Sequence, residues 1–299
     1  MMKRVGISIF NLQEQFGDFR AIEIAKEIGA DCVDFNLCGF DVANGESVYA
    51  RGEDEVRAYF RRLKEYADKL GIGIEQTHGR ITGVKKDEKF NADFIKSAKM
   101  DCIATKELGA KYCVMHAITS MVFGADAPDE LMYSVNNKMF ADILPFAVKE
   151  DIIIATETFG DAPGLGCNEF FGDMTHFINS YEKLANVPEF SKHFCICMDT
   201  GHTHRSTRFE GNPKVGDVIR KMGGAIKVLH LHDNDGYKDQ HKIPMTGTLD
   251  WKDTITALCE IGYDGAYNLE VLLTHFGKDF MIEEARFAVK VMRQILSTY

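Results

Sequence analysis

Side chains that bind metals or move protons fall at the ends of the apolar runs of this sequence. Six successive runs end in a histidine or a carboxylate: His78, His116, Glu157, Asp199, His232 and Glu270. Imidazole and carboxylate groups are ligands for divalent ions. Each residue alone could equally cap a helix or line a rim. Three carboxylates gathered without a cation, however, would raise one another's pKa values at a cost in stability, so the set predicts a metal centre.

Two further histidines lie close in sequence to these residues. His202 follows Asp199 by three residues at a predicted strand-to-helix turn, so both side chains can reach one site. His230 shares a strand face with His232, because side-chain direction repeats every two residues. We expect His232, the nearer to the strand end, to be the ligand, and His230 to be a core or supporting residue.

The apolar runs alternate with amphipathic segments along the whole chain. The runs resemble parallel strands buried on both faces: Val5–Phe10, Cys32–Leu37, Gly73–His78, Tyr112–His116, Ile152–Thr158, Phe194–Asp199, Ile226–His232 and Gly265–Glu270. The amphipathic segments predict helices: Asp18–Ile28, Asp54–Leu70, Phe90–Leu108, Asp129–Lys149, Met174–Leu184, Pro213–Met222, Trp251–Ile261 and Phe280–Leu296.

This alternation, without a linker, predicts an α/β fold: one (β/α)8 TIM barrel domain over residues 1–299. Active sites of such barrels lie at the C-terminal ends of the strands, where the predicted ligands fall. A doubly wound open sheet is the alternative, but no glycine-rich turn follows the first strand.

The composition of the chain limits the classes of molecule that we expect the protein to bind. The net charge of −10 disfavours nucleic acid and anionic lipid as partners. No apolar run approaches the roughly 20 residues of a membrane span. The apolar stretch at the start is too short for a signal peptide, and the eight cysteines form no CxxC pair, so we expect a cytoplasmic protein. The sequence leaves open whether the protein forms a homo-oligomer.

Several motifs together resemble the xylose isomerase-like barrel superfamily, the group of sugar phosphate isomerases and epimerases. They are Glu157-Thr158-Phe159-Gly160, Met198-Asp199-Thr200-Gly201-His202, His230-Leu231-His232-Asp233-Asn234-Asp235, Met245-Thr246-Gly247-Thr248-Leu249-Asp250-Trp251 and Leu269-Glu270. The resemblance covers nearly the whole chain. It implies a metal-dependent enzyme of carbohydrate metabolism, an isomerase or epimerase, and is less specific for the substrate.

In ketose 3-epimerases of this group, the metal is held by residues that match Glu157, Asp199, His232 and Glu270. The two glutamates there also form the acid–base pair, and the match of His202 contacts substrate. Two positions depart from that pattern. Pro163 replaces a second glutamate, and Lys238 stands where an arginine binds substrate, offering a point charge but no bidentate fork. The resemblance therefore does not imply ketohexose 3-epimerase activity itself.

Endonuclease-IV-type DNA repair enzymes share the barrel and use three zinc ions. Their ligand set has matches at His78, His116, Glu157, Asp199, His202, His232, Asp239, His241 and Glu270. The acidic net charge and the lack of basic loops argue against DNA as the substrate. The nuclease is therefore kept as an alternative to the sugar enzyme.

The predicted site favours proton abstraction next to a carbonyl on a ketose or related polyol. We expect Mn²⁺ as the cofactor, with Mg²⁺, Co²⁺ and Zn²⁺ as alternatives, acting as a Lewis acid that stabilises an enediolate. Glu157 and Glu270 would remove and return the proton. Return of the proton to the substrate gives epimerisation or isomerisation. The same first step serves an inosose-type dehydratase or a C-glycoside lyase, which remain alternatives.

The small-molecule sugar would contact residues around these glutamates. The expected substrate-binding residues are His202, His116, His78, Lys238, Asp239 and His241. Asp239 and His241 could instead bind metal or be solvated, and Lys238 could be an ordinary surface lysine. His202 is the candidate for holding a hydroxyl or a developing oxyanion.

Overall fold

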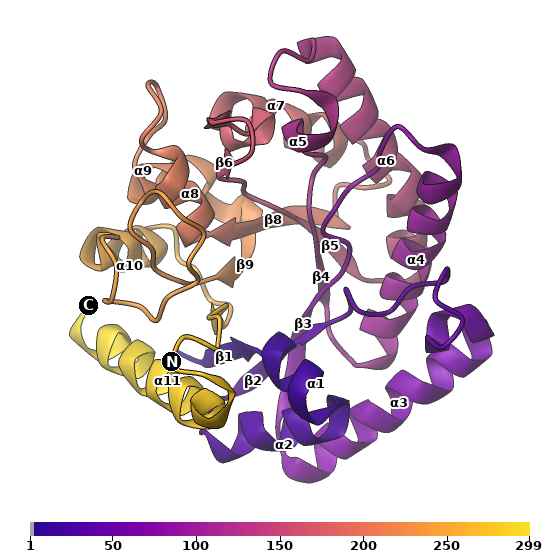
Figure 1. The fold of residues 1–299 in the computed structure, drawn as a ribbon, viewed down its shortest axis with the longest axis vertical. Coiled ribbons are helices and arrows are strands. Elements are labelled where there is room, and N and C mark those ends of the chain that lie inside the picture. The colour runs from indigo at the N-terminus through magenta and orange to yellow at the C-terminus, as the bar shows by residue number, and fades with distance from the viewer. Residues whose placement is uncertain (1–2) are drawn as a thin grey trace.

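The computed structural model describes residues 3–299, which form a barrel of eight parallel strands surrounded by helices (Figure 1). The barrel strands are β1 Val5–Ser8, β2 Cys32–Asn36, β3 Gly73–His78, β4 Tyr112–Met115, β5 Ile153–Glu157, β8 Phe194–Asp199, β9 Ile226–His230 and β10 Tyr267–Leu269. Their order around the sheet is β10-β1-β2-β3-β4-β5-β8-β9. This arrangement confirms the predicted (β/α)8 barrel.

The barrel closes between β9 and β10 through one bridge just beyond the end of β9. Leu231 pairs with Leu269 in parallel there. The amide of Leu231 donates to the carbonyl of Asn268 at 2.9 Å, and the amide of Glu270 donates to the carbonyl of Leu231 at 3.1 Å. The closure thus joins the two strand ends that carry predicted site residues.

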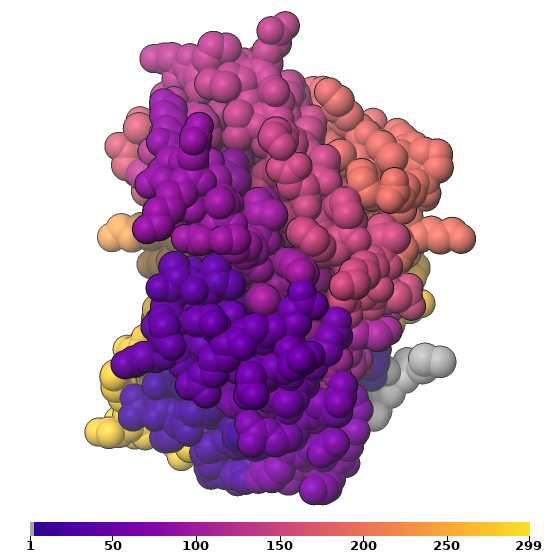
Figure 2. Space-filling view, turned by 90° about the vertical axis from the view of Figure 1, so that its right-hand side faces the viewer, coloured from indigo at the N-terminus to yellow at the C-terminus, as the bar shows by residue number. Residues whose placement is uncertain are grey.

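Helices cover the outside of the barrel (Figure 1), and the side of the molecule shown in Figure 2 is closely packed. They are α1 Phe10–Phe16, α2 Asp18–Glu27, α3 Glu53–Leu70, α4 Glu88–Glu107, α5 Ser120–Phe123, α6 Asp129–Glu150, α7 Met174–Ala185, α8 Thr200–Ser206, α9 Val215–Met222, α10 Trp251–Glu260 and α11 Met281–Thr298. Short 3-10 helices occur at η1 Val48–Arg51, η2 Phe170–Gly172, η3 Gly223–Ala225 and η4 Lys278–Phe280.

The eight predicted helices are all present, and the differences concern short elements. The first strand ends at Ser8 rather than Phe10, because a helical turn begins there: the amide of Gln13 donates to the carbonyl of Ile9 at 2.8 Å. Helices α1, α5 and α8 were not predicted, and neither was the hairpin of β6 Asp161–Ala162 with β7 Cys167–Asn168. Each is too short to show a clear hydrophobic period.

Local sequence explains where the helices begin and end. The carboxylate of Asp250 accepts from the amide of Asp253 at 3.0 Å and caps α10. Asp173 caps α7 in the same way. Gly71 ends α3 in the left-handed conformation with φ 67°, which glycine adopts without a steric penalty.

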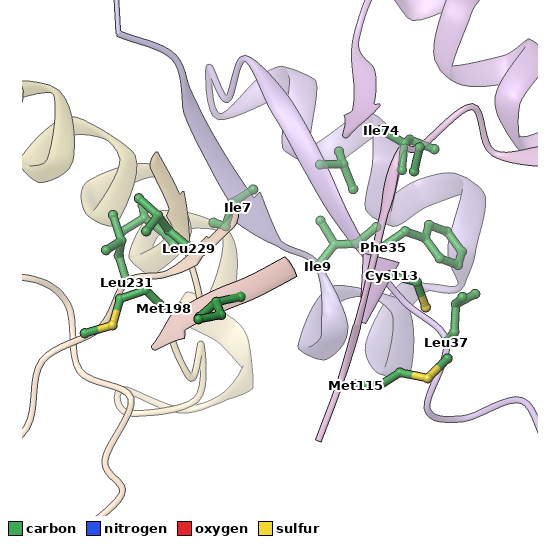
Figure 3. Packing of buried hydrophobic residues seen from close by; sticks show 14 of the residues in the cluster. Ile7, Ile9, Phe35, Leu37, Ile74, Cys113, Met115, Met198, Leu229 and Leu231 are labelled. Atoms are coloured by element: carbon green, nitrogen blue, oxygen red, sulfur yellow. The ribbon is translucent and has the colours of Figure 1, made fainter. Parts of the chain in front are cut away.

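The alternation of side chains along each strand divides the core in two. Alternate residues such as Ile7, Phe35 and Leu229 point outward and pack into the large core beneath the helices (Figure 3). The inner set forms a smaller apolar cluster, which consists of Val114, Ala155, Cys195, Cys197 and Val228. Further polar residues on the same strands are also fully buried, so the barrel encloses both an apolar cluster and polar groups.

Two observations bear on the cysteines and on membranes. Cys195 and Cys197 both belong to the inner cluster, and all eight cysteines are free. No helix in residues 3–299 combines the length and the apolar character that a membrane crossing requires.

A buried ion pair fixes the loop after β3. The guanidinium of Arg80 donates to Asp101 from Nε at 2.7 Å and from Nη2 at 3.2 Å, and Nη2 also donates to the carbonyl of Leu37 at 2.6 Å. The hydroxyl of Tyr49 donates to the same carboxylate at 2.8 Å. Asp101 is fully buried on α4, so the pair ties this loop to the outer layer.

Removing one partner of this pair leaves a buried charge without compensation. We expect Asp101→Ala to lower the free energy of unfolding by about 3–5 kcal/mol, measured by urea denaturation. Asp68→Ala breaks the exposed pair with Lys64 and should cost about 0.5 kcal/mol or less. A loss for Asp101→Ala no larger than that of the control would contradict this prediction.

Candidate metal centre at the barrel mouth

Glu157 lies at the end of β5 in the middle of a ring of histidines, and its side chain is only 1% exposed. Its carboxylate oxygens lie 3.1 Å from Nε2 of His116, 3.1 Å from Nδ1 of His202 and 3.2 Å from Nδ1 of His230. Nε2 of His78 lies at 3.5 Å. Four strand ends thus deliver imidazoles to one carboxylate.

Glu270 follows β10 and reaches the same histidines from another side of the barrel. Its carboxylate lies 3.4 Å from Nδ1 of His230 and 3.6 Å from Nε2 of His78. Its backbone carbonyl accepts a hydrogen bond from Nδ1 of His241 at 2.9 Å, with that nitrogen as donor. The two glutamates therefore face a common space, and the predicted convergence of strand ends is observed.

Possible ligand atoms gather in three groups, each with its atoms within 4.8 Å of one another, and the first two groups share Glu157 and His230. The first group consists of Glu157, Asp199, His230 and Glu270. The second consists of His78, Glu157 and His230. The third consists of His202, His232, Asp239 and His241.

His230, rather than His232, joins the group that contains both glutamates and Asp199. Strand β9 ends at His230, so its inward side chain lies level with the ends of β5 and β8. His232 lies beyond the strand, where its ring stacks on His241 at 3.9 Å between centroids. Its Nε2 still lies 3.1 Å from both carboxylate oxygens of Asp199. This placement differs from the sequence-based expectation, in which His232 is the ligand and His230 is a core or supporting residue.

Opposite charges hold these buried groups in their ionised forms. Burial raises the pKa of Glu157, but the imidazoles of His116 and His230 outweigh burial and hold this pKa well below its usual value. Burial likewise opposes ionisation of Asp199, yet His202 and His232 lower its pKa to about 2. The carboxylates of Glu157 and Asp199 are therefore ionised before any cation enters.

The histidines respond in the opposite direction. Burial lowers the pKa of His202, but the carboxylates of Asp199 and Asp239 outweigh burial and hold it well above its usual value. For His241, burial is outweighed by Asp239 and Glu270, and the pKa rises to about 9. Protons on these imidazoles balance the carboxylates, and a metal ion would replace them.

The donor set fits a divalent cation. Among residues 3–299, both carboxylate oxygens of Glu157, Nδ1 of His230 and Oε2 of Glu270 are buried without a hydrogen-bond partner. Buried polar atoms normally have partners. Nδ1 of His230 lies 3.2 Å from Oε2 of Glu157 and 3.4 Å from Oε2 of Glu270, so these three atoms face one another. One nitrogen and several carboxylate oxygens suit Zn²⁺ or Mn²⁺. A cation in this group would give a partner to these three atoms.

A cavity of about 430 Å³ opens onto these groups. Of the expected substrate-binding residues, those that line it are His78, His116, His202, Asp239 and His241. Lys238 is exposed and does not line the cavity, because Asp235 turns the loop there by accepting from the amides of Tyr237 and Lys238 at 2.9 Å. Pro163 is also exposed, on the β6–β7 hairpin.

Residues that the sequence did not single out line the other side of the cavity. They come from the ends of β1, β2, β3 and β10, and they are Ser8, Phe10, Asn11, Asn36, Cys38, Ile81, Val271 and Leu272. Their positions at strand ends were the only sequence feature that could have indicated a role in the site. Asparagine, serine and aliphatic residues are common at strand ends for other reasons, so this feature is weak.

The sequence matches the family described as xylose isomerase-like TIM barrel over residues 22–294. This chain belongs to that family. It is also 26% identical over 171 residues to the uncharacterised protein y4fM of Sinorhizobium fredii, a match that covers 56% of this chain and 50% of y4fM. The matched segment thus spans only about half the length of this curated relative.

Solved structures share the whole fold. A D-tagatose 3-epimerase-like protein superposes with a TM-score of 0.73 at 17% identity, over 99% of this chain and 97% of that one. The IolI protein, solved with a zinc atom, gives 0.72 at 17% identity over 99% of both chains. The 3-keto-D-glucoside 4-epimerase YcjR from E. coli gives 0.71 at 13% identity, over 98% and 99%. At these identities the likeness shows the fold.

The placement of the two β9 histidines leads to a direct prediction. We expect His230→Ala to weaken Mn²⁺ binding at least tenfold, because its nitrogen lies within the group of both glutamates, and His232→Ala to weaken it less. Isothermal titration calorimetry on metal-stripped protein measures both affinities. The reverse order would show that His232 is the ligand.

Proton displacement gives a second prediction. Because the pKa values of His202 and His241 are raised, a metal ion must displace protons from this cluster, and affinity should increase from about pH 6 to about pH 9. Calorimetry in two buffers of different ionisation enthalpy measures the protons released. A pH-independent affinity without proton release would contradict the prediction.

Proposed function

We propose that this protein is a metal-dependent sugar isomerase or epimerase that abstracts a proton next to a carbonyl of a ketose or related polyol. The observation that carries the proposal is the group of Glu157, Asp199, His230 and Glu270, whose two glutamates line a substrate-sized cavity. Pockets for small ligands usually have volumes of roughly 300–1,000 Å³. Membership of the family and the resemblance to sugar epimerases support it.

The proposed metal ligands are the four residues of that group, with His230 in the place first expected for His232. A divalent cation held there would polarise a carbonyl oxygen as a Lewis acid. We propose Mn²⁺ as the physiological ion; the zinc atom in IolI shows that a relative of the same fold accepts Zn²⁺. The carboxylate-rich donor set is compatible with either ion.

The two glutamates would perform the proton transfer. Glu157 comes from the end of β5 and Glu270 from the end of β10, which are not adjacent in the barrel. Each can therefore approach a bound sugar from a different side, one removing the proton and the other returning it. Glu157 is buried, and this burial keeps competing water away from its carboxylate.

The histidines around the glutamates would orient the substrate. His78, His116 and His202 line the cavity and can donate hydrogen bonds to sugar hydroxyls or to a developing oxyanion. Asp239 and His241 close the same side of the cavity. Return of the proton to the opposite face of the carbon gives epimerisation, and return to the neighbouring carbon gives isomerisation.

Two related reactions share the first step. Loss of a hydroxyl from the deprotonated sugar gives an inosose-type dehydratase, and loss of a carbon-linked group gives a C-glycoside lyase. Ketose 3-epimerases carry a substrate-binding arginine and a second glutamate at the positions of Lys238 and Pro163. Both residues are exposed here, so the proposal names a broad class of substrate rather than a ketohexose. The cytoplasm is the proposed compartment, because all eight cysteines are free.

A DNA repair nuclease is the second candidate, favoured by the group of His202, His232, Asp239 and His241, which could hold an additional ion. The net charge of −10 opposes binding to phosphate backbones. Nicking of duplex DNA with an abasic site, with activity falling steeply as salt rises, would support the nuclease. Absence of nicking in the presence of Zn²⁺ would remove this candidate.

Proton exchange with D₂O tests the shared chemical step. We expect the Mn²⁺-loaded protein to incorporate deuterium into at least one ketose, inosose or 3-keto-glycoside, and EDTA to abolish the exchange. Glu157→Gln and Glu270→Gln should each reduce it by about 10²-fold or more, because an amide is no base. The matched control Glu65→Gln, exposed on α3, should leave it unchanged. Exchange that survives both glutamate variants would overturn the proposal.

A further inference from the structure

One carboxylate in the barrel interior lies outside the metal group and touches it through a single histidine. Asp34, on β2, is fully buried. Its Oδ2 accepts three hydrogen bonds of 3.1 Å each, from Nε2 of Gln76, Nε2 of His230 and Nδ2 of Asn268. Donors from β3, β9 and β10 therefore converge on one oxygen of a β2 side chain.

The ring of His230 bridges this carboxylate and the candidate metal group. Nε2 faces Asp34, while Nδ1 lies 3.2 Å from Glu157 and 3.4 Å from Glu270. A neutral imidazole has one donor nitrogen and one acceptor nitrogen. A carboxylate can only accept, so in the neutral ring the bond to Asp34 favours the proton on Nε2 and leaves the lone pair of Nδ1 directed at the metal group.

Without that acceptor, the opposite tautomer would be favoured. Glu157 and Glu270 are themselves acceptors for a proton on Nδ1. A proton there would fill the position that a metal ion needs. Two carboxylates on one side of the ring thus compete with Asp34 on the other side, and full burial of Asp34 strengthens its share of that competition.

We propose that Asp34 is the positioning residue of the metal centre, which fixes the tautomer and ring orientation of His230. The inference rests on the metal group of the proposed function, but on no particular substrate or reaction. Asn268 also donates to this carboxylate and precedes Glu270 by two residues, so Asn268 and Glu270 point to the same side of the strand.

Variants of Asp34 separate this role from a general contribution to barrel stability. Asp34→Leu removes the acceptor at similar volume and should weaken Mn²⁺ binding about 10–100-fold. Asp34→Asn keeps an acceptor oxygen without the charge and should weaken it about fivefold, since hydrogen bonds to charged groups are the stronger ones. The Asn variant decides the question if the Leu variant does not fold.

Gln76→Leu is the matched control, because it removes another donor to the same oxygen without touching His230. We expect its Mn²⁺ affinity to stay within about threefold of the wild type. Calorimetry on stripped protein measures affinity, and thermal unfolding of the same samples measures stability. The visible absorption of bound Co²⁺ should change with Asp34→Asn and not with Gln76→Leu, because only the former disturbs a ligand.

The outcomes distinguish this inference from the proposed function. If the wild-type protein binds neither Mn²⁺ nor Co²⁺, the metal centre and the role of Asp34 both fall. If the wild type binds metal and the Asp34 variants match Gln76→Leu in affinity and in Co²⁺ spectrum, the role of Asp34 is overturned while the metal centre stands. Weaker binding confined to the Asp34 variants supports the inference.

Discussion

Several carboxylates share a small buried space at one end of the barrel, and the arrangement of the mouth depends on balancing their charge. Glu157, Asp199 and Glu270 come from three different strand ends, and the histidines between them supply the opposite charge. Like charges this close would otherwise favour protonation of one carboxyl group. The pKa values of Glu157 and Asp199 are lowered instead, which keeps them available as ligands.

Closure of the barrel is what brings these groups together. The final bridge between Leu231 and Leu269 joins the strand ends that carry His230 and Glu270. Without it, β9 and β10 would be free edges, and Asn268 and His230 would have no common partner across the interior. The polar contacts around Asp34 lie inside the same ring, and these contacts link the backbone closure to the orientation of a proposed ligand.

The cavity combines two kinds of wall. Histidines and carboxylates from β3, β4, β5 and the loop after β9 line one part, while residues such as Phe10 and Leu272 contribute apolar surface from β1 and β10. In TIM barrels the residues at the C-terminal ends of the strands and in the loops that follow them set the chemistry, and both kinds of wall come from such positions here.

The sequence by itself determined the barrel, its eight long helices and the convergence of strand-end histidines and carboxylates, because hydrophobic period and the parallel repeat are local properties. Short elements such as α1 and the β6–β7 hairpin were not predicted, because a few residues show no hydrophobic period. Only the tertiary structure placed His230, rather than His232, in the group with both glutamates, because that placement depends on where β9 ends relative to β5 and β8. It also decided that Lys238 lies away from the cavity, and that Asp34, 196 residues from His230 in the chain, contacts that ring. Such contacts follow from the register of the closed sheet, which no local pattern records.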